Sequence, residues 1–296
     1  MSAPTRATTA GRAYLDLRKL ARANRRPVDE LLQLYVLEAF LARLTGSRFA
    51  ERLVLKGGVL LAAFDERRPT RDIDLQAQAI ENDLETIRAA TCEVAAIALD
   101  DGVVFDVETA TAELIRDEEI YSGVRVTMQT QLATARQHFH VDTNVGDPIT
   151  PAPIEVRLPR LLGGEVSLRG YPLAMVYAEK ILTAIVRGTV NTRWRDFADV
   201  YMLTRRHPID GTELVGSIRR VAEHRRAQLV PLAEVLAGYA EIAQQRWAAW
   251  RRRQRLEDRL PERFDDVLSA VIAFADPAIL GPAAGLTWDP LACDWS

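Results

Sequence analysis

Cysteine and lysine are scarce in this chain of 296 residues. The two cysteines, Cys92 and Cys293, lie far apart and lack the spacing of metal ligands. This argues against a disulfide-rich scaffold and a cysteine-based zinc domain, and it favours free thiols in a reducing cytoplasm. No apolar run is long enough to span a membrane, and no secretory signal is recognisable at the N-terminus. We therefore expect a cytoplasmic protein without a membrane partner.

The hydrophobic content of 48% is typical of a globular protein with a sizeable core. Hydrophobic periodicity predicts helices over 12–45 with a break near 24–27, 82–99, 173–187, 193–204, 211–225, 231–256 and 261–275. It predicts strands over 53–55, 72–75, 102–109, 122–130 and 138–144. The proline-rich residues 148–163 are expected to be an irregular crossing between two lobes, and the chain past Pro277 a tail.

Residues 55–75 contain the most informative pattern in the sequence. A short apolar strand leads into Lys56, Gly57 and Gly58, and a helical run over 59–64 follows directly. Two glycines at a helix start let backbone N–H groups approach a phosphate, and the helix dipole favours the anion. The pattern indicates a phosphate-binding turn, although a Gly-Gly pair before a helix is also common in ordinary turns.

The same stretch ends in Thr-Arg-Asp-Ile-Asp-Leu, residues 70–75. Side chains alternate along a strand, so Asp72 and Asp74 point the same way, about 7 Å apart. Carboxylates so placed suit Mg²⁺, although an Asp-x-Asp pair also occurs on solvated strand faces. A phosphate-binding turn, a helix and an Asp-x-Asp strand in this order indicate nucleotidyl transfer.

This segment resembles the first motif of DNA-polymerase-β-type nucleotidyltransferases. More narrowly, it is similar to the AbiEii family of bacterial toxins, including the mycobacterial MenT toxins. A second block is similar as well, since the family has an Ala-x-Lys helix followed by an Arg-x-(Lys/Arg)-Asp-x-x-Asp helix. The corresponding segments here are Ala178-Glu179-Lys180 and Arg193-Trp194-Arg195-Asp196-Phe197-Ala198-Asp199. The resemblance spans residues 50–205.

The resemblance implies an α/β (α+β) fold with two lobes. A mixed-sheet nucleotidyltransferase lobe would cover residues 1–150 and a helical bundle residues 151–296. It also implies the toxin of a type IV-like toxin–antitoxin system, with an antitoxin protein as its partner. Such an enzyme would use two Mg²⁺ ions and an NTP, with a pyrimidine nucleotide preferred, to extend the 3′ acceptor end of tRNA. The extension would block aminoacylation and translation.

Within that scheme Asp72 and Asp74 would bind the metal ions and act in catalysis. A third carboxylate is expected from a nearby strand. Asp142 is the first choice, because its neighbours alternate in a strand register, and Asp147 is the second. Lys56, Gly57 and Gly58 would bind the nucleotide phosphates.

The second block would complete the site. Lys180 would reach the triphosphate, and two of the chain's three lysines, Lys56 and Lys180, fall inside the two motifs. Arg193, Asp196 and Asp199 follow at helical spacing, where an Arg–Asp pair orients either Lys180 or the nucleotide. An ordinary salt bridge within the helix is the alternative. In the resembled family the lysine and aspartates of these helices belong to the site, with Asp196 among the catalytic residues and Arg193 and Asp199 among those that bind nucleotide.

Thr70 lies two residues before Asp72 and shares its strand face. We expect its hydroxyl beside the nucleotide and the metals. In the MenT-like group a serine or threonine here is phosphorylated by a kinase-like antitoxin, so the resemblance implies a regulatory phosphosite. A phosphate would add about two negative charges next to two carboxylates and block the site. A threonine chosen for its β propensity is the alternative.

A C-terminal cluster, Arg251, Arg252, Arg253 and Arg255, lies close to Trp247 and Trp250. Arginines with aromatic residues suit contacts with an RNA backbone and stacking on bases, so we expect a tRNA-binding face. Acidic neighbours dilute the run, and a solvated helix face is the alternative. Two other functions stay open: a nucleotidyltransferase that modifies a small molecule, and a non-catalytic toxin that acts by binding. We expect a monomer.

Overall fold

The computed structural model describes residues 3–115, 123–146 and 148–296. Its contacts divide the chain into two compact units, which are described separately. The first unit comprises Met1–Gly146 with Ile154–Gly170, and the second comprises Asp147–Pro153 with Tyr171–Ser296. The expected lobe boundary after residue 150 falls within the short segment that the contacts group with the second unit.

The first unit contains a seven-stranded mixed sheet in the order β3-β4-β5-β2-β1-β7-β6. The strands are β1 (Leu53–Lys56), β2 (Asp72–Ala77), β3 (Val103–Ile115), β4 (Gly123–Leu132), β5 (Ala135–Val145), β6 (Ile154–Pro159) and β7 (Glu165–Gly170). β2 pairs with β5 in parallel and with β1 in antiparallel orientation. The β2–β5 pairing brings distant parts of the sequence together at the centre of the sheet. The expected mixed α/β fold is confirmed.

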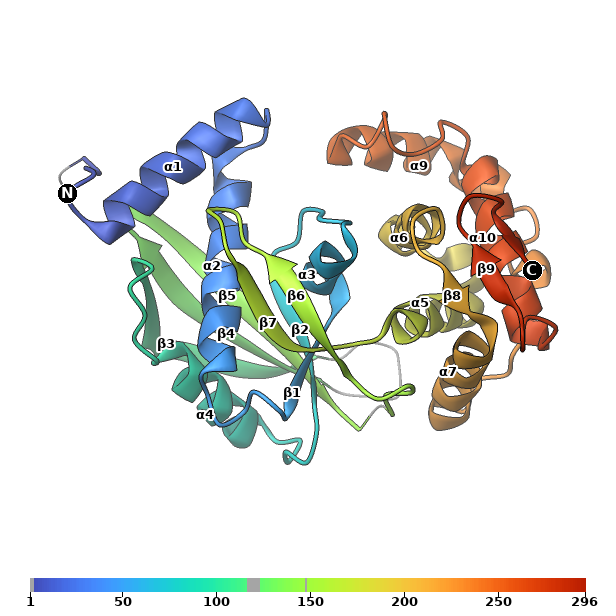
Figure 1. Ribbon diagram of the computed structural model, residues 1–296, viewed down its shortest axis with the longest axis horizontal. Coiled ribbons are helices and arrows are strands. Elements are labelled where there is room, and N and C mark those ends of the chain that lie inside the picture. The colour runs from blue at the N-terminus through green and yellow to red at the C-terminus, as the bar shows by residue number, and fades with distance from the viewer. Residues whose placement is uncertain (1–2, 116–122, 147) are drawn as a thin grey trace. The chain divides into compact units, whose positions relative to one another are not determined.

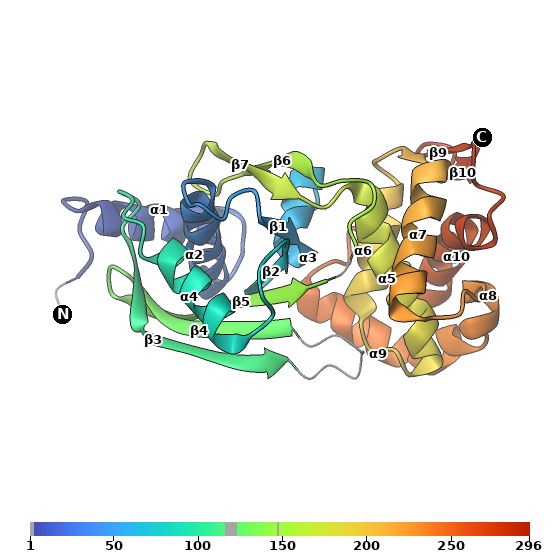
Figure 2. The ribbon, with the colours of Figure 1, turned by 90° about the horizontal axis from the view of Figure 1, so that it is seen from below.

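Helices α1 (Thr9–Ala23), α2 (Val28–Thr45) and α4 (Leu84–Ala95) belong to this unit. Figure 2 shows α2 and α4 on one side of β3, β4 and β5. Phe40 of α2 packs there against Phe105 and Phe139 of the sheet, with ring centroids 4.9–6.1 Å apart. These buried rings form the core, and they leave the opposite side chains of β4 and β5 outside it.

The helical run after the glycines begins at Gly57, two residues earlier than expected. It consists of one α turn, α3 (Gly57–Leu60), and a 3₁₀ turn, η1 (Leu61–Phe64). A helix dipole therefore adds little to anion binding at this turn, because two short turns of different type align few peptide units. Any phosphate binding here depends on the local backbone N–H groups.

The second unit is mostly helical. Its longer helices are α5 (Leu173–Arg187), α6 (Trp194–Thr204), α7 (Gly211–Arg225), α9 (Tyr239–Gln254) and α10 (Phe264–Leu280), with the short α8 (Leu232–Val235) and η2 (Gly188–Val190). Aromatic rings of Trp194, Phe197, Tyr239 and Phe264 meet in its core, with centroids 5.5–6.0 Å apart. Figure 1 shows α5, α6, α7 and α10 as neighbouring helices of this bundle.

Three sequence expectations are wrong. The segment 148–163 is not irregular throughout, because β6 forms a hairpin with β7 and extends the sheet. The helix expected over 231–256 breaks at Gly238, whose φ of 74° is unsuited to a helix. The chain past Pro277 is not simply a tail: α10 continues to Leu280, and β9 (Thr287–Asp289) pairs with β8 (Ile209–Asp210) and β10 (Asp294–Trp295). β7 and β9 join these two hairpins to β1 and β8, which are distant in sequence.

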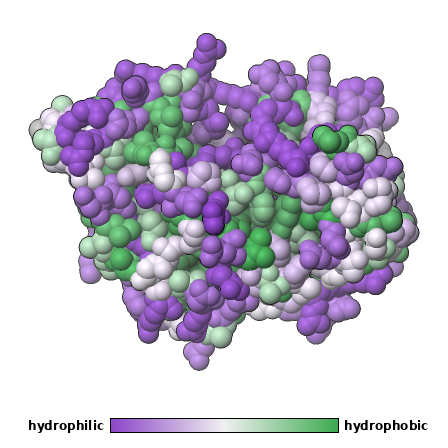
Figure 3. All heavy atoms as spheres, in the orientation of Figure 1, coloured by the Kyte–Doolittle hydropathy of each residue, from purple (hydrophilic) through white to green (hydrophobic). Residues whose placement is uncertain are grey.

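Both cysteines are free thiols. Among the described residues, no helix has the length and apolar character needed to cross a bilayer. Hydrophilic side chains predominate on the face shown in Figure 3, interrupted by small groups of apolar ones.

Candidate active site

Three carboxylates converge on the central strands of the first unit. Asp72 and Asp74 lie on β2, and Asp142 lies on β5, directly opposite Asp74 in the parallel register. Each residue offers an oxygen within 4.8 Å of the others. The strand pairing explains this convergence, because register partners project from the same side of a sheet. The structure thus brings together the expected Asp-x-Asp pair and the first choice for the third carboxylate, while Asp147 lies outside the described residues.

A row of charged side chains crosses four neighbouring strands at this level. Lys56 of β1 is the partner of Asp74, which is the partner of Asp142, which is the partner of Arg125 on β4. In order across the sheet, the row is a cation, two acids and a cation. Asp72 adds a third acid two residues before Asp74 on β2, on the same side of the sheet. Carboxylates this close repel one another, which favours a cation bound between them.

Arg125 was not identified from the sequence. Its Nε and one terminal nitrogen donate to the two carboxylate oxygens of Asp142 at 2.8 and 2.7 Å. The hydrogen bond to Asp142 raises the pKa of Arg125 further above its already high value. The alternation of residues 122–130 indicated a strand, but only the strand pairing shows that Arg125 faces Asp142. Both oxygens of Asp142 are thus oriented by a fixed guanidinium fork.

Gly57 lies against the acidic cluster. Its φ is +69°, and a Cβ atom at this position would come within 1.8 Å of Asp74 Oδ2. Glycine is therefore required both by the backbone conformation and by the close approach of the carboxylate. At Gly58 a Cβ atom would lie 2.9 Å from Thr70 Oγ1 and 3.1 Å from the guanidinium of Arg68. The Gly-Gly turn is thus lined by the Asp74 carboxylate, the Thr70 hydroxyl and the Arg68 guanidinium, and Arg68 is a second residue that the sequence did not single out.

Thr70 shares the face of Asp72, as its position two residues earlier predicts. Its hydroxyl donates to Asp72 Oδ1 at 2.9 Å, and only 9% of the residue is exposed. The hydroxyl is therefore part of the acidic cluster and fixes one carboxylate oxygen.

The donor set fits a divalent metal such as Mg²⁺. All three ligand candidates supply hard carboxylate oxygens, and Asp72 and Asp74 are partly exposed, so water could complete the coordination. Asp72, Asp74 and Asp142 are therefore the residues that would hold the metal.

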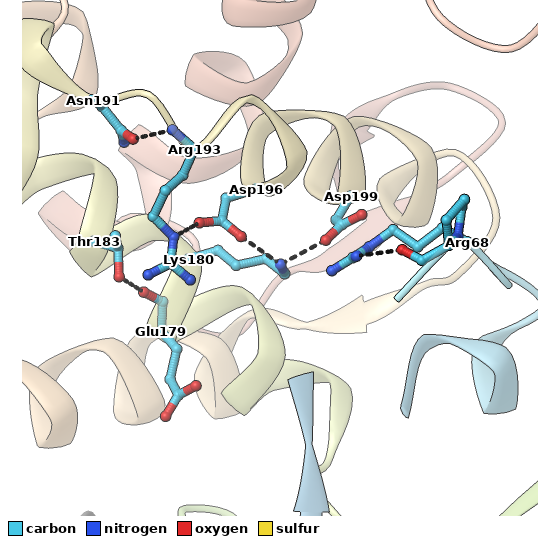
Figure 4. Close-up of polar contacts among 9 residues, drawn as sticks. Arg68, Glu179, Lys180, Thr183, Asn191, Arg193, Asp196 and Asp199 are labelled. Carbon is cyan, nitrogen blue, oxygen red and sulfur yellow. Dashed lines mark hydrogen bonds and ion pairs between the residues drawn. The ribbon is translucent and has the colours of Figure 1, made fainter. Parts of the chain in front are cut away.

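The second expected group of residues forms a separate cluster in the second unit (Figure 4). The ammonium of Lys180, on α5, donates to Asp196 Oδ1 at 2.9 Å and to Asp199 Oδ2 at 2.7 Å. Arg193 Nε donates to the other oxygen of Asp196 at 2.7 Å. Asp196 thus takes part both in the i,i+3 salt bridge given as the alternative and in the contact to Lys180.

Burial makes this cluster tightly coupled. Asp199 has no exposed side-chain surface, Asp196 has 6%, and Lys180 retains 13%. Burial by itself would raise the pKa of Asp196, but the charges of Lys180 and Arg193 hold that pKa well below its usual range. Both aspartates face cations within their own unit.

The arginines of the C-terminal cluster differ from one another. Arg252, Arg253 and Arg255 are exposed. Arg251, in contrast, donates to the backbone carbonyls of Leu260 and Glu257 at 2.9 and 2.7 Å, and so ties α9 to the loop before α10. Trp247 is wholly buried, so the expected use of its ring to stack on bases is wrong.

A family model described as "Nucleotidyl transferase AbiEii toxin, Type IV TA system" matches residues 39–270. Two solved structures from Helicobacter pylori are similar, each with 14% sequence identity and 90% of this chain covered. One is a "putative nucleotidyltransferase" with a TM-score of 0.43 and 93% of its own chain covered, and the other is JHP933, with a TM-score of 0.44 and 90% covered. No curated protein matches the chain. The family match includes every residue of the two clusters described above.

Proposed function

The chain belongs to the AbiEii family of nucleotidyltransferase toxins of type IV toxin–antitoxin systems, and from this membership we propose that it transfers nucleotides from an NTP, a pyrimidine nucleotide by preference, to the 3′ acceptor end of tRNA. It is a nucleotidyltransferase, and its family implies an antitoxin partner. Extension of the acceptor end would remove the hydroxyl that aminoacylation uses and so stop translation.

The observation that carries the proposal is the convergence of Asp72, Asp74 and Asp142 beside the Gly57 turn. Carboxylates that share metal ions next to a phosphate-binding turn are what transfer of a nucleotidyl group needs. Two Mg²⁺ ions bound there would supply charge neutralisation for the attacking hydroxyl and for the departing pyrophosphate.

The chain's own residues have distinct roles in this proposal. The backbone at Gly57 and Gly58 binds phosphate, and Lys56 provides positive charge beside it. Arg125 keeps both oxygens of Asp142 in place while the substrate binds. We assign the cytoplasm as the place of action and a monomer as the working form.

Lys180 is proposed to contact the triphosphate through its remaining donor. Two of its three N–H bonds point to Asp196 and Asp199, which fix the position of the ammonium. Arg193 fixes Asp196 in turn. The exposed Arg252, Arg253 and Arg255 are proposed to contact the tRNA backbone, whereas the contacts of Arg251 to backbone carbonyls give it a mainly structural role.

Thr70 is proposed as the site at which a kinase-like antitoxin acts. A phosphate on Oγ1 would replace its hydrogen bond to Asp72 with repulsion between like charges. Because Thr70 is largely buried, a kinase could reach it only after the loop before β2 opens. Thr70→Glu should abolish transfer, and an active Thr70→Glu protein would show that charge at this position is harmless.

The direct test is to incubate purified protein with total tRNA and each labelled NTP in the presence of Mg²⁺. We expect the label to appear at the 3′ end of tRNA, with CTP or UTP preferred, and to disappear with EDTA or in Asp72→Ala. A parallel incubation replaces the tRNA with an extract of small metabolites. If no RNA is labelled but a compound of that extract is, the small-molecule alternative is correct. Toxicity without any transfer, retained by Asp72→Ala, would support the non-catalytic alternative.

A further inference from the structure

A polar face extends from the acidic cluster along β4 and β5. Register partners on these strands share a side of the sheet, as the hydrogen bonds between Arg125 and Asp142, and between Thr127 and His140, confirm. The next two pairs along the strands continue the face: Gln129 with His138, and Gln131 with Arg136.

The face becomes more exposed with distance from the cluster. Asp142 is buried, Thr127 and His140 are half-buried, and the four side chains beyond them are exposed. From Asp142 to Arg136 the face is roughly 20 Å long, since a strand rises about 3.4 Å per residue. It is therefore an open platform that leads directly into the cluster.

The platform extends beyond the start of β2. β2 begins at Asp72, opposite His140, so the preceding residues of β5 have no β2 partner. Gln33 of α2 compensates by donating to the carbonyls of His138 and Arg71 at 3.3 and 3.1 Å. The strand edge is thus held in place from the core side, while the polar side chains project from the other side.

The chemistry of these side chains suits a nucleic acid. Beyond Asp142 the face has no carboxylate on β4 or β5, and Arg136 is its exposed cation. On the neighbouring β3, Asp106 is the register partner of Gln129 and Glu113 that of Arg125, so acids border the face on that side. Threonine, glutamine and histidine side chains all donate hydrogen bonds, and imidazole and guanidinium planes also stack on unpaired bases. Repeated donors together with the guanidinium of Arg136 suit a phosphate backbone.

The strand order places this face on a defined side of the cluster. In the sequence β4-β5-β2-β1, the acids lie on β5 and β2, and the Gly57 turn follows β1. The proposed phosphate site of the NTP and the β4–β5 platform therefore flank the acids on opposite sides. In a transfer reaction the attacking strand and the NTP must approach the metal ions from different directions.

We propose that the β4–β5 platform binds the single-stranded 3′ end of the acceptor RNA and guides it to the acidic cluster. This inference rests on the proposed function, since it assigns a surface to the acceptor of that reaction. It is separate from the C-terminal arginines, which lie in the other unit. The exposed side chains Gln129, Arg136 and His138 are the ones to test, because none is part of the core.

The test uses the full chain with alanine at all three positions, without NTP and at several salt concentrations. The probes are intact total tRNA and the same tRNA trimmed of its unpaired 3′ nucleotides. We expect wild-type protein to bind the intact tRNA better and the triple variant to bind both equally, with at least tenfold weaker binding of the intact form. Arg136→Ala alone should reduce the magnitude of the salt slope by about 0.7, the value for one phosphate contact in a single strand.

Arg157→Ala is the matched control, because Arg157 is an exposed arginine on β6, at the other edge of the same sheet. It should bind like wild type. A triple variant that still distinguishes intact from trimmed tRNA would overturn the proposal, as would a raised KM for NTP with unchanged tRNA binding. A wild-type protein that transfers nucleotides to no RNA would instead refute the proposed function.

Discussion

The two charged clusters of this protein differ in how they are neutralised. In the first unit three carboxylates lie within 4.8 Å of one another, and two of them are partly exposed. In the second unit each of two buried carboxylates accepts a hydrogen bond from Lys180, and one of them also from Arg193. The acids of the first cluster repel one another and favour a bound cation, whereas the acids of the second are each paired with a cation of the protein.

This difference indicates different roles for similar residues. An acid whose charge repels its neighbours contributes little to folding, so its presence points to ligand binding. A buried acid paired with a lysine cannot lose that partner without leaving an uncompensated charge, which typically costs 3–5 kcal/mol. Substitution of the partly exposed Asp72 or Asp74 should therefore affect transfer alone, and substitutions in the second cluster should affect stability as well.

The largest effect is expected from Asp72→Asn or Asp74→Asn. Each should reduce transfer at least about a thousandfold, because a metal ligand is lost, while the melting temperature stays the same or rises as repulsion is relieved. Mg²⁺ should raise the melting temperature of the wild type but not of either variant. Asp100→Asn, an exposed change in the turn before β3, is the control. Near-normal transfer in either variant would refute the metal site.

Lys180→Met should break the balance of the second cluster. We expect a loss of about 3–5 kcal/mol in the free energy of unfolding, together with at least about tenfold weaker transfer. Lys19→Met removes an exposed lysine and should change neither quantity. Adding Asp196→Asn and Asp199→Asn to Lys180→Met should recover stability but not transfer. Denaturant titration and kinetics separate these outcomes, and full stability in Lys180→Met would show that the pairing is unimportant.

Gly57→Ala tests the close approach of the backbone to Asp74. The positive φ costs about 1–2 kcal/mol for any residue with a Cβ atom, and displacement of the carboxylate should lower transfer about a hundredfold. Gly164→Ala is matched, because its φ is +78° and its Cβ would meet nothing within 4 Å. We expect the two variants to lose similar stability and only Gly57→Ala to lose transfer. Equal transfer rates would mean that the cluster tolerates the shift.

The smallest effect is expected from Thr70→Val, which removes only the hydrogen bond to Asp72. A loss of about 1 kcal/mol corresponds to a transfer rate several-fold lower, provided that the hydroxyl only positions the carboxylate. Rates measured across Mg²⁺ concentrations should show weaker apparent metal affinity with little change at saturation. Inactivity comparable to that of Asp72→Asn would assign Thr70 a direct role in the reaction.

Local patterns predicted much of this fold. The periodicity of residues 12–45 indicated α1 and α2 with the correct break, and the alternation of residues 72–75 and 138–144 indicated β2 and β5. The strands from residue 148 onward were missed. β8, β9 and β10 have only two or three residues, and the β6–β7 and β9–β10 hairpins join the rest of the fold through β1 and β8, which no local window contains.

The sequence by itself determined the chemistry available: an Asp-x-Asp strand after a Gly-Gly turn, and a lysine helix followed by an Arg-x-x-Asp helix. These features depend on spacing along one or two neighbouring elements, which the periods of strand and helix fix. Only the tertiary structure decided that Asp142 meets Asp74, that Arg125 holds Asp142, and that Lys180 lies between two aspartates. Strand register and helix packing bring residues together across long stretches of chain, because they are set by burial of the opposite, apolar faces.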